Sequence, residues 1–203
     1  MTHHYIFDLF GTLVVNAGQP TLAKTLFPEA DYQELRLFLR RDFGSRDNCI
    51  TKIEKRFNLT INPRRRKCVL QTIDQGIARA TLFPYAKEVL STLRDHSKIG
   101  LLSNNDNLME SIIDKLHLRG YFDAITLSHQ VGVLKPDDEI YLRCIDRLNV
   151  RINDVIMVGN DLEKDVKKPI RLGMMGLLFD PYGLQPSYEH RVTSLKDILG
   201  HSF

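Results

Sequence analysis

The chain contains 203 residues, of which 43% are hydrophobic and 26% are charged, as is ordinary for a soluble globular protein. No apolar run approaches the roughly 18 residues that cross a bilayer, and the N-terminus lacks a secretory-signal pattern. The net charge of +3 is too small to argue for a nucleic-acid partner. Three widely spaced cysteines suit a reducing compartment and argue against a disulfide framework. We therefore expect a cytoplasmic protein without a nucleic-acid or membrane partner.

The charge is distributed unevenly along the chain. Residues 16–82 carry 13 Lys and Arg against 7 Asp and Glu, whereas the remainder carries 15 against 18. A basic segment inserted into a weakly acidic chain indicates two parts with different roles, and a basic wall beside a site would attract an anion. For the most basic run, residues 64–67 (RRRK), the alternative is a solvated helix face.

The first predicted element is a buried strand over residues 5–10 (YIFDLF), which a Gly-Thr turn closes. The pattern then becomes helical. One amphipathic helix is expected over residues 32–43 and another, with proline at its first position, over residues 63–80. No strand pattern interrupts residues 16–82, which predicts a small helical unit inserted directly after the first strand.

Beyond residue 83, strands and helices alternate. Further strands are expected at residues 98–103, 122–127, 154–159 and 175–179. The helices between and around them are expected at residues 85–94, 106–118, 136–148 and 164–172. This alternation implies right-handed crossovers and a parallel sheet covered on both faces. The predicted fold class is a doubly wound, Rossmann-like α/β core formed by residues 1–15 and 83–203, with residues 16–82 as a helical cap.

In such a sheet, ligands bind beyond the carboxyl ends of the strands, at the switch point of the strand order. Polar residues occupy four positions there, namely Asp8 with Thr12, Ser103 with Asn104, Lys135, and Asn160 with Asp161 and Asp165. Asp8 is able to attack a substrate and form a covalent intermediate, while Lys135 would offset negative charge. Free N–H groups after Ser103 would bind a phosphate or a carboxylate. Each of these residues is also common in turns, but the set together indicates an active site.

The same set suits a metal ion. The carboxylates of Asp8, Asp161 and Asp165 and the amide oxygen of Asn160 are hard oxygen ligands of the kind that Mg²⁺ takes. Mg²⁺ is therefore the expected cofactor, and a small anionic molecule is the expected substrate. His129 either lines this crevice or packs in the core. None of these patterns distinguishes a monomer from a homodimer.

Four segments resemble the signature motifs of the haloacid dehalogenase superfamily. They are residues 8–13 (DLFGTL), 102–104 (LSN), 135–136 (KP) and 158–165 (VGNDLEKD). The resemblance extends from Tyr5 to about Leu199, and the predicted insertion matches the helical cap of that superfamily. It implies a hydrolase whose cap selects the substrate.

The resemblance also implies roles for single residues. Asp8 is the implied nucleophile, Thr12 helps to orient it, and Lys135 steadies it. Ser103 and the Asn104 amide are implied to hold the transferred group, together with Lys135.

Two positions depart from the phosphatases of this superfamily. Phe10 stands where they carry a second Asp, which protonates the leaving alcohol and later activates water, and a phenyl ring cannot transfer a proton. Asn160 stands where a carboxylate metal ligand is usual, and Asp161 is its expected replacement because of its spacing from Asp165. The implied metal ligands are thus Asp8, Asn160, Asp161, Asp165 and the backbone carbonyl of Phe10, whose side chain belongs to the substrate site.

Three functions remain open from the sequence. The first is Mg²⁺-assisted hydrolysis of a small phosphorylated metabolite through a covalent intermediate on Asp8, weakened because Phe10 replaces the acid–base Asp. The second is metal-free hydrolysis of 2-haloacids, and the third is a catalytically impaired family member that binds an anion or a protein partner. The acidic fourth motif favours the first function, whereas Phe10 favours the other two. We expect a phosphatase-type hydrolase.

Overall fold

The computed structural model describes residues 3–15, 27–28, 30–41 and 46–202. Residues 16–26 and 42–45, which belong to the predicted cap, lie outside the described residues. The last two residues of the helix expected over residues 32–43 are among them.

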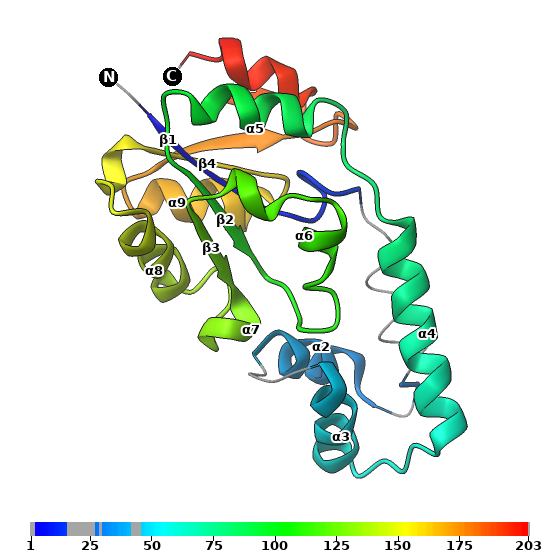
Figure 1. Ribbon diagram of the computed structural model, residues 1–203. Coiled ribbons are helices and arrows are strands. Elements are labelled where there is room, and N and C mark those ends of the chain that lie inside the picture. The colour runs from blue at the N-terminus through cyan, green and yellow to red at the C-terminus, as the bar shows by residue number, and fades with distance from the viewer. Residues whose placement is uncertain (1–2, 16–26, 29, 42–45, 203) are drawn as a thin grey trace.

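A six-stranded parallel sheet forms the centre of the molecule (Figure 1). From one edge to the other, the strands are β3 (Ala124–Leu127), β2 (Ile99–Ser103), β1 (His4–Phe7), β4 (Val155–Gly159), β5 (Met175–Phe179) and β6 (Arg191–Val192). The predicted doubly wound α/β class is confirmed. β6 was not predicted, because two residues are too few to show an apolar pattern in the sequence.

Both faces of the sheet are covered, which explains why its central strands are continuous apolar runs. Every residue of β2 and β4 is buried. The side chains of Ile6 and Phe7 point to opposite faces, as alternation along a strand requires. Ile6 packs in the cluster under helix α8 (Asp138–Leu148), and Phe7 packs in the larger cluster with α5 (Ala86–Arg94).

The order of the strands determines where the switch point of the sheet lies. From β1 the chain passes to β2 and β3 on one side, and then to β4, β5 and β6 on the other. The switch point therefore lies at the carboxyl end of β1, between β2 and β4. Asp8 follows β1 there, and its N–H donates to the carbonyl of Val158 in β4 at 2.9 Å.

The remaining helices of the core are short. They are α6 (Ile112–Lys115), α7 (Ser128–Val131), a π-helical segment over Leu162–Lys167 that continues into α9 (Lys168–Arg171), and 3₁₀ turns at Arg119–Tyr121, Ile152–Asp154 and Leu195–Gly200. The helix predicted over residues 106–118 was too long. Residues 107–111 form turns, the first of which the Asp106 carboxylate caps by accepting from the Met109 N–H at 3.0 Å, and the regular helix is limited to α6.

The helix predicted over residues 164–172 begins earlier, after Asp161. The Asp161 carboxylate accepts from the N–H groups of Glu163 and Lys164 at 3.1 and 3.0 Å, which starts the helix at Leu162. Pro169 lacks an N–H and would clash with the carbonyl four residues back in a regular helix. The wider π-helical turn before Pro169 accommodates it.

Three helices lie apart from the sheet (Figure 1): α2 (Tyr32–Arg41), α3 (Arg46–Phe57) and α4 (Pro63–Arg79). Pro63 stands at the start of α4, and the side chain of Asn62 caps that helix by accepting from the Arg65 N–H at 2.9 Å. The buried residues of α4, Val69, Ile73 and Ile77, recur every four positions. The exact limits of the cap, residues 16–82, stay a prediction.

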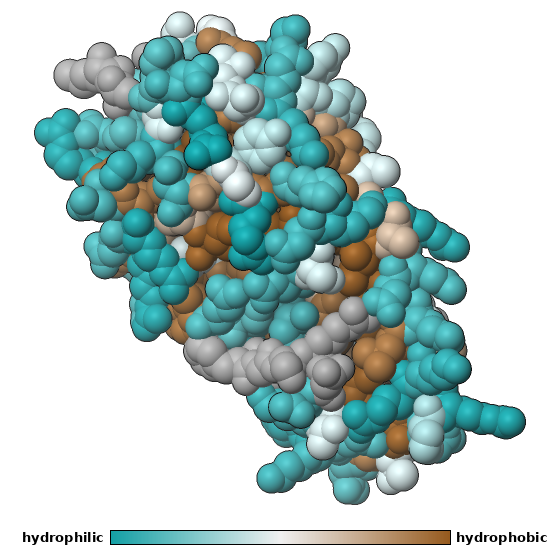
Figure 2. Space-filling view, in the orientation of Figure 1, coloured by the Kyte–Doolittle hydropathy of each residue, from teal (hydrophilic) through white to brown (hydrophobic). Residues whose placement is uncertain are grey.

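Hydrophilic residues cover most of the face in Figure 2, with hydrophobic residues exposed in patches between them. Within the described residues, no helix is long and apolar enough to cross a bilayer. All three cysteines are free thiols.

Candidate active site

A cavity of about 220 Å³ opens at the switch point. Residues from all four of the predicted motifs line it, including Asp8, Ser103, Lys135 and Asp165. Its other wall is one face of α2. Segments that are far apart in the sequence therefore meet at one edge of the sheet, as the strand order requires.

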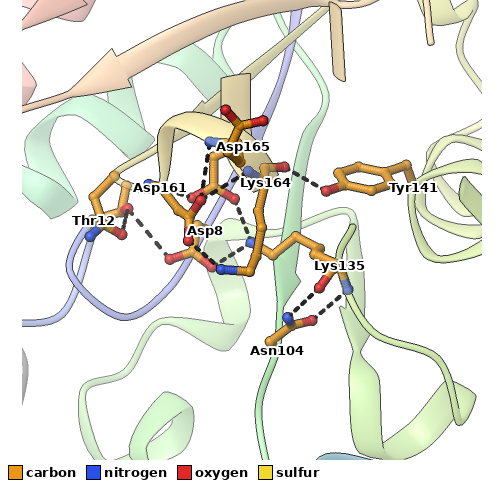
Figure 3. Close-up of polar contacts among 10 residues, drawn as sticks. Asp8, Thr12, Asn104, Lys135, Tyr141, Asp161, Lys164 and Asp165 are labelled. Carbon is orange, nitrogen blue, oxygen red and sulfur yellow. Dashed lines mark hydrogen bonds and ion pairs between the residues drawn. The ribbon is translucent and has the colours of Figure 1, made fainter. Parts of the chain in front are cut away.

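Lys135 is the centre of the polar network (Figure 3). Its Nζ donates to Asp8 Oδ1 and to Asp165 Oδ1, both at 2.7 Å. The Lys135 and Asp165 side chains are each 2% exposed, and that of Asp8 is 10% exposed. Burial alone would lower the pKa of Lys135, but the carboxylates of Asp165 and Asp8 outweigh it and hold this pKa above its ordinary value. Lys135 is therefore charged and fixed against Asp8.

Asp165 is held by a second hydrogen bond and packs closely against Gly159. Its Oδ2 accepts from the Asp161 N–H at 3.0 Å. Burial raises the pKa of Asp165, the charge of Lys135 opposes that rise, and the neighbouring Asp8 adds to it. A Cβ on Gly159 would lie 2.3 Å from Asp165 Cγ, so only glycine at position 159 allows this carboxylate its place.

Thr12 lies on the other side of Asp8. Its Oγ1 is 3.5 Å from Asp8 Oδ2 and 3.5 Å from Asn160 Oδ1. Asn160 in turn packs on Gly11, whose φ is +82° and where a Cβ would meet the Asn160 amide at 2.7 Å. The turn after β1 thus brings the Asn160 amide oxygen toward Asp8.

Asp161 lines the cavity, but its carboxylate binds other groups of the protein. Its carboxylate caps the following helix and forms an ion pair with Lys164. Burial would raise the pKa of Asp161, but the hydrogen bonds from Lys164 outweigh it and lower this pKa. The Lys164 carbonyl accepts from the Tyr141 hydroxyl at 2.5 Å, which ties this segment to α8.

The two residues at the end of β2 differ in their surroundings. Ser103 is 1% exposed and lines the cavity. The side chain of Asn104 binds the backbone of Lys135 through both its amide nitrogen and its oxygen. That side chain therefore holds the Lys135 segment, a role that the sequence analysis did not foresee.

The cavity is also lined by residues outside the predicted site. Tyr32, Arg36 and Arg40 of α2 line it, as does Asp106. In the sequence, the only feature that groups Tyr32, Arg36 and Arg40 is their spacing of four residues. His129 does not line it in the described part of the chain: it is buried, with Nε2 2.8 Å from Glu110 Oε2, which favours the core interpretation.

The donor chemistry of the site suits Mg²⁺. The carboxylates of Asp8 and Asp165 and the amide oxygen of Asn160 are hard oxygen ligands. Among the described residues, no group of three or more His, Cys, Asp or Glu side chains is arranged to hold a metal ion. Because the Asp161 carboxylate is bound to Lys164 and to helix N–H groups, Asn160 is the freer donor of the two.

Residues 2–168 match the model of a protein family described as haloacid dehalogenase-like hydrolase. The chain belongs to this family. The predicted family and the predicted enzyme class, a hydrolase, are therefore confirmed. The roles of the individual site residues stay predictions.

Relatives of this haloacid dehalogenase-like hydrolase include the pyrimidine 5'-nucleotidase YjjG of Escherichia coli (strain K12), 29% identical over 58% of this chain and 55% of the relative. N-acylneuraminate-9-phosphatase of Rattus norvegicus is 33% identical over 46% of this chain and 38% of the relative. The chain thus aligns with about half or less of the length of these curated relatives.

Solved structures of the same fold cover nearly the whole chain. A phosphatase from Thermococcus onnurineus has a TM-score of 0.70 at 20% identity, with 98% of this chain and 96% of that chain covered. A 2-haloacid dehalogenase from Pseudomonas syringae pv. Tomato DC3000 has a TM-score of 0.72 at 17% identity, with 98% and 97% covered. Both kinds of enzyme share this fold, so the fold alone does not separate them.

Proposed function

We propose that this hydrolase cleaves a small phosphomonoester through a covalent phosphoryl intermediate on Asp8. The observation that carries the proposal is the buried Lys135 ammonium, which binds Asp8 and Asp165 at once. A carboxylate nucleophile, a fixed cation and a second carboxylate in one cavity suit a phosphoryl group and its charge. The relatives that are named a 5'-nucleotidase and a 9-phosphatase support this class of substrate.

The reaction requires two displacements at phosphorus. In the first, a carboxylate oxygen of Asp8 bonds to phosphorus, the bond to the leaving oxygen breaks, and the alcohol takes a proton from solvent. In the second, water bonds to phosphorus and the bond to Asp8 breaks, which releases phosphate and a proton and restores the carboxylate. Lys135 holds Asp8 in place, and Ser103 binds the phosphoryl oxygens.

Asp8 and Asp165, with the Asn160 amide oxygen and the Phe10 carbonyl, would hold Mg²⁺. When bound, the ion supplies positive charge that offsets the charge of the phosphoryl group. Asp161 remains an alternative ligand, although its carboxylate already pairs with Lys164.

Phe10 is expected to limit the rate of phosphomonoester hydrolysis. Phe10 lines the cavity, and its phenyl ring provides no proton to the leaving alcohol. General acid–base help supplies about 10²–10⁴-fold in rate, so hydrolysis of esters with poor leaving groups is expected to be slow. A cytoplasmic location, selection of the substrate by the cap and a small anionic substrate are parts of the same proposal.

Phe10 also favours a second candidate function, the metal-free hydrolysis of 2-haloacids. A halide leaves without taking up a proton, so an aromatic residue at this position does not slow that reaction. Against it stands the acidity of the fourth motif, because Asp161 and Asp165 supply carboxylate oxygens that a metal-free reaction does not need as ligands.

One pair of assays tests the proposal. The purified protein is given p-nitrophenyl phosphate with Mg²⁺ and with EDTA in its place, and a 2-haloacid with chloride release as the readout. We expect hydrolysis of p-nitrophenyl phosphate that depends on Mg²⁺, and no chloride release. Chloride release without phosphatase activity would replace the proposal by the second candidate. Absence of both activities would leave a catalytically impaired family member.

A further inference from the structure

One face of the cap helix α2 carries a row of cavity-lining residues. Tyr32, Arg36 and Arg40 follow one another at intervals of four, and all three line the cavity that contains Asp8. Residues four apart lie one above the other on a helix, so the two guanidinium groups are neighbours. The part of the cavity wall that α2 forms therefore carries two cations.

Among the described residues, neither of these arginines forms a direct ion pair with a carboxylate. Neither Arg36 nor Arg40 lies within 4.0 Å of a carboxylate oxygen in the described part of the chain. Burial, and then the charge of Arg36, lower the pKa of Arg40, while the charges of Asp106 and Asp8 oppose this only in part. A guanidinium keeps its charge at neutral pH even so.

The cations on the core side of the cavity are different. Lys135 donates to Asp8 and Asp165, and Lys164 pairs with Asp161. Their charges are thus already balanced by carboxylates. On α2, two arginines line the cavity, and besides Asp8 the carboxylate whose charge acts on Arg40 is Asp106, so an excess of positive charge belongs to α2.

We propose that Arg36 and Arg40 form a second anion-binding subsite, and that the natural substrate is a small phosphomonoester whose leaving group carries a further carboxylate or phosphate. The inference rests on the proposed function for the position of the phosphoryl group on the core side. Two adjacent guanidinium groups suit either anion, since both accept paired hydrogen bonds from arginine. Tyr32 adds a phenol at the end of the same row.

The test compares three phosphate esters of one chain length: propyl phosphate, 3-phosphooxypropanoate and propane-1,3-diyl bisphosphate. We expect kcat/KM to be at least about tenfold higher for one of the two doubly anionic esters than for propyl phosphate, about 1.4 kcal/mol. Arg36→Gln with Arg40→Gln is expected to remove this preference. The ester that shows the larger preference identifies a carboxylate or a phosphate as the second anion.

Arg41 provides the matched control. It is the next residue of the same helix, is exposed, and borders a separate surface hollow with Glu34, Phe38 and Arg56. Arg41→Gln removes the same charge from α2 and is expected to keep the preference within about twofold. An equal loss of preference in Arg41→Gln would show a general effect of cap charge and would overturn the subsite.

Two outcomes separate this inference from the proposed function. Hydrolysis of all three esters with equal kcat/KM would overturn the subsite and leave the phosphatase proposal intact. If no ester is hydrolysed, the proposed function fails, and calorimetric binding of 3-phosphooxypropanoate and the bisphosphate decides the inference. Binding that exceeds that of propyl phosphate and is lost in the double variant but not in Arg41→Gln supports the subsite, and its absence overturns it.

Discussion

Asn104 and Lys135 are joined by two hydrogen bonds through one amide group. The Asn104 Nδ2 donates to the Lys135 carbonyl at 2.9 Å, and the Lys135 N–H donates to Asn104 Oδ1 at 2.7 Å (Figure 3). The end of β2 thereby fixes the backbone from which the Lys135 side chain reaches Asp8. Asn104 is in this way a positioning residue for the cation of the site.

Replacing Asn104 with alanine is expected to release the Lys135 backbone. Loss of the two hydrogen bonds should lower the free energy of unfolding by about 1–3 kcal/mol. A misplacement of about 1 Å costs up to roughly 10²-fold in rate, so kcat should fall by about 10–100-fold while KM changes little. Steady-state kinetics and thermal unfolding measure both effects. A raised KM at unchanged kcat would instead indicate that the Asn104 side chain binds substrate.

Replacing Phe10 with aspartate is expected to restore a proton donor beside Asp8. Mg²⁺-dependent hydrolysis of phosphomonoesters should rise, by at most the roughly 10²–10⁴-fold that a placed acid–base group supplies. The added charge near Asp8 must be offset, so the gain should vanish when Mg²⁺ is removed. Phe10→Leu serves as the control for loss of the ring. A folded Phe10→Asp protein without any gain would count against a phosphoryl-transfer site.

The half-buried Glu110 and the buried His129 form a pair that predicts a pH-dependent contribution to stability. The hydrogen bond from His129 lowers the pKa of Glu110, against the opposing effect of burial. A carboxyl whose pKa is lower in the folded state stabilises the fold above its unfolded pKa, ordinarily about 4.3, and this contribution disappears as the pH falls through the folded pKa. Glu110→Gln should therefore lower the free energy of unfolding by about 1 kcal/mol at pH 7 and by much less near pH 3.

Denaturant unfolding at several pH values measures this difference. Glu139→Gln is the control, since Glu139 forms an exposed pair with Arg143 on α8, and such pairs contribute about 0–1 kcal/mol. A difference between wild type and Glu110→Gln that is constant from pH 7 to pH 3 would show that the ionised Glu110 carboxylate contributes nothing.

The sheet could be predicted because each strand is marked by a local run of apolar residues. The position of the four motifs at one edge of the sheet then follows from the order of the strands. Runs such as residues 99–102 (IGLL) are free of charged residues, as buried parallel strands require, and the switch-point rule then places Asp8, Lys135 and Asp165 at one edge. The rule concerns backbone topology, so it does not specify that Lys135 bonds to both carboxylates at once.

Other features could not be predicted because they depend on tertiary contacts. The spacing of Arg36 and Arg40 is the same for a solvated helix face and for a face that lines a cavity, and only the packing of α2 distinguishes them. Asn104 lies within a motif, yet its bonds to the Lys135 backbone cross 31 positions of the sequence. Turns stand at residues 107–111 in place of the expected helix, although the amphipathic pattern of residues 106–118 is that of a helix.

The central claim is that Asp8 carries the reaction, and the turnover of Asp8→Asn tests it most directly. The asparagine keeps the shape of the side chain and an oxygen that accepts from Lys135, which retains Asp165 as a partner, so the melting temperature should stay near that of the wild type. Turnover should fall by more than about 10³-fold, at least about 4 kcal/mol of barrier. Turnover within about tenfold of the wild type, a barrier change of only about 1.4 kcal/mol, would contradict the assignment of Asp8 as the nucleophile.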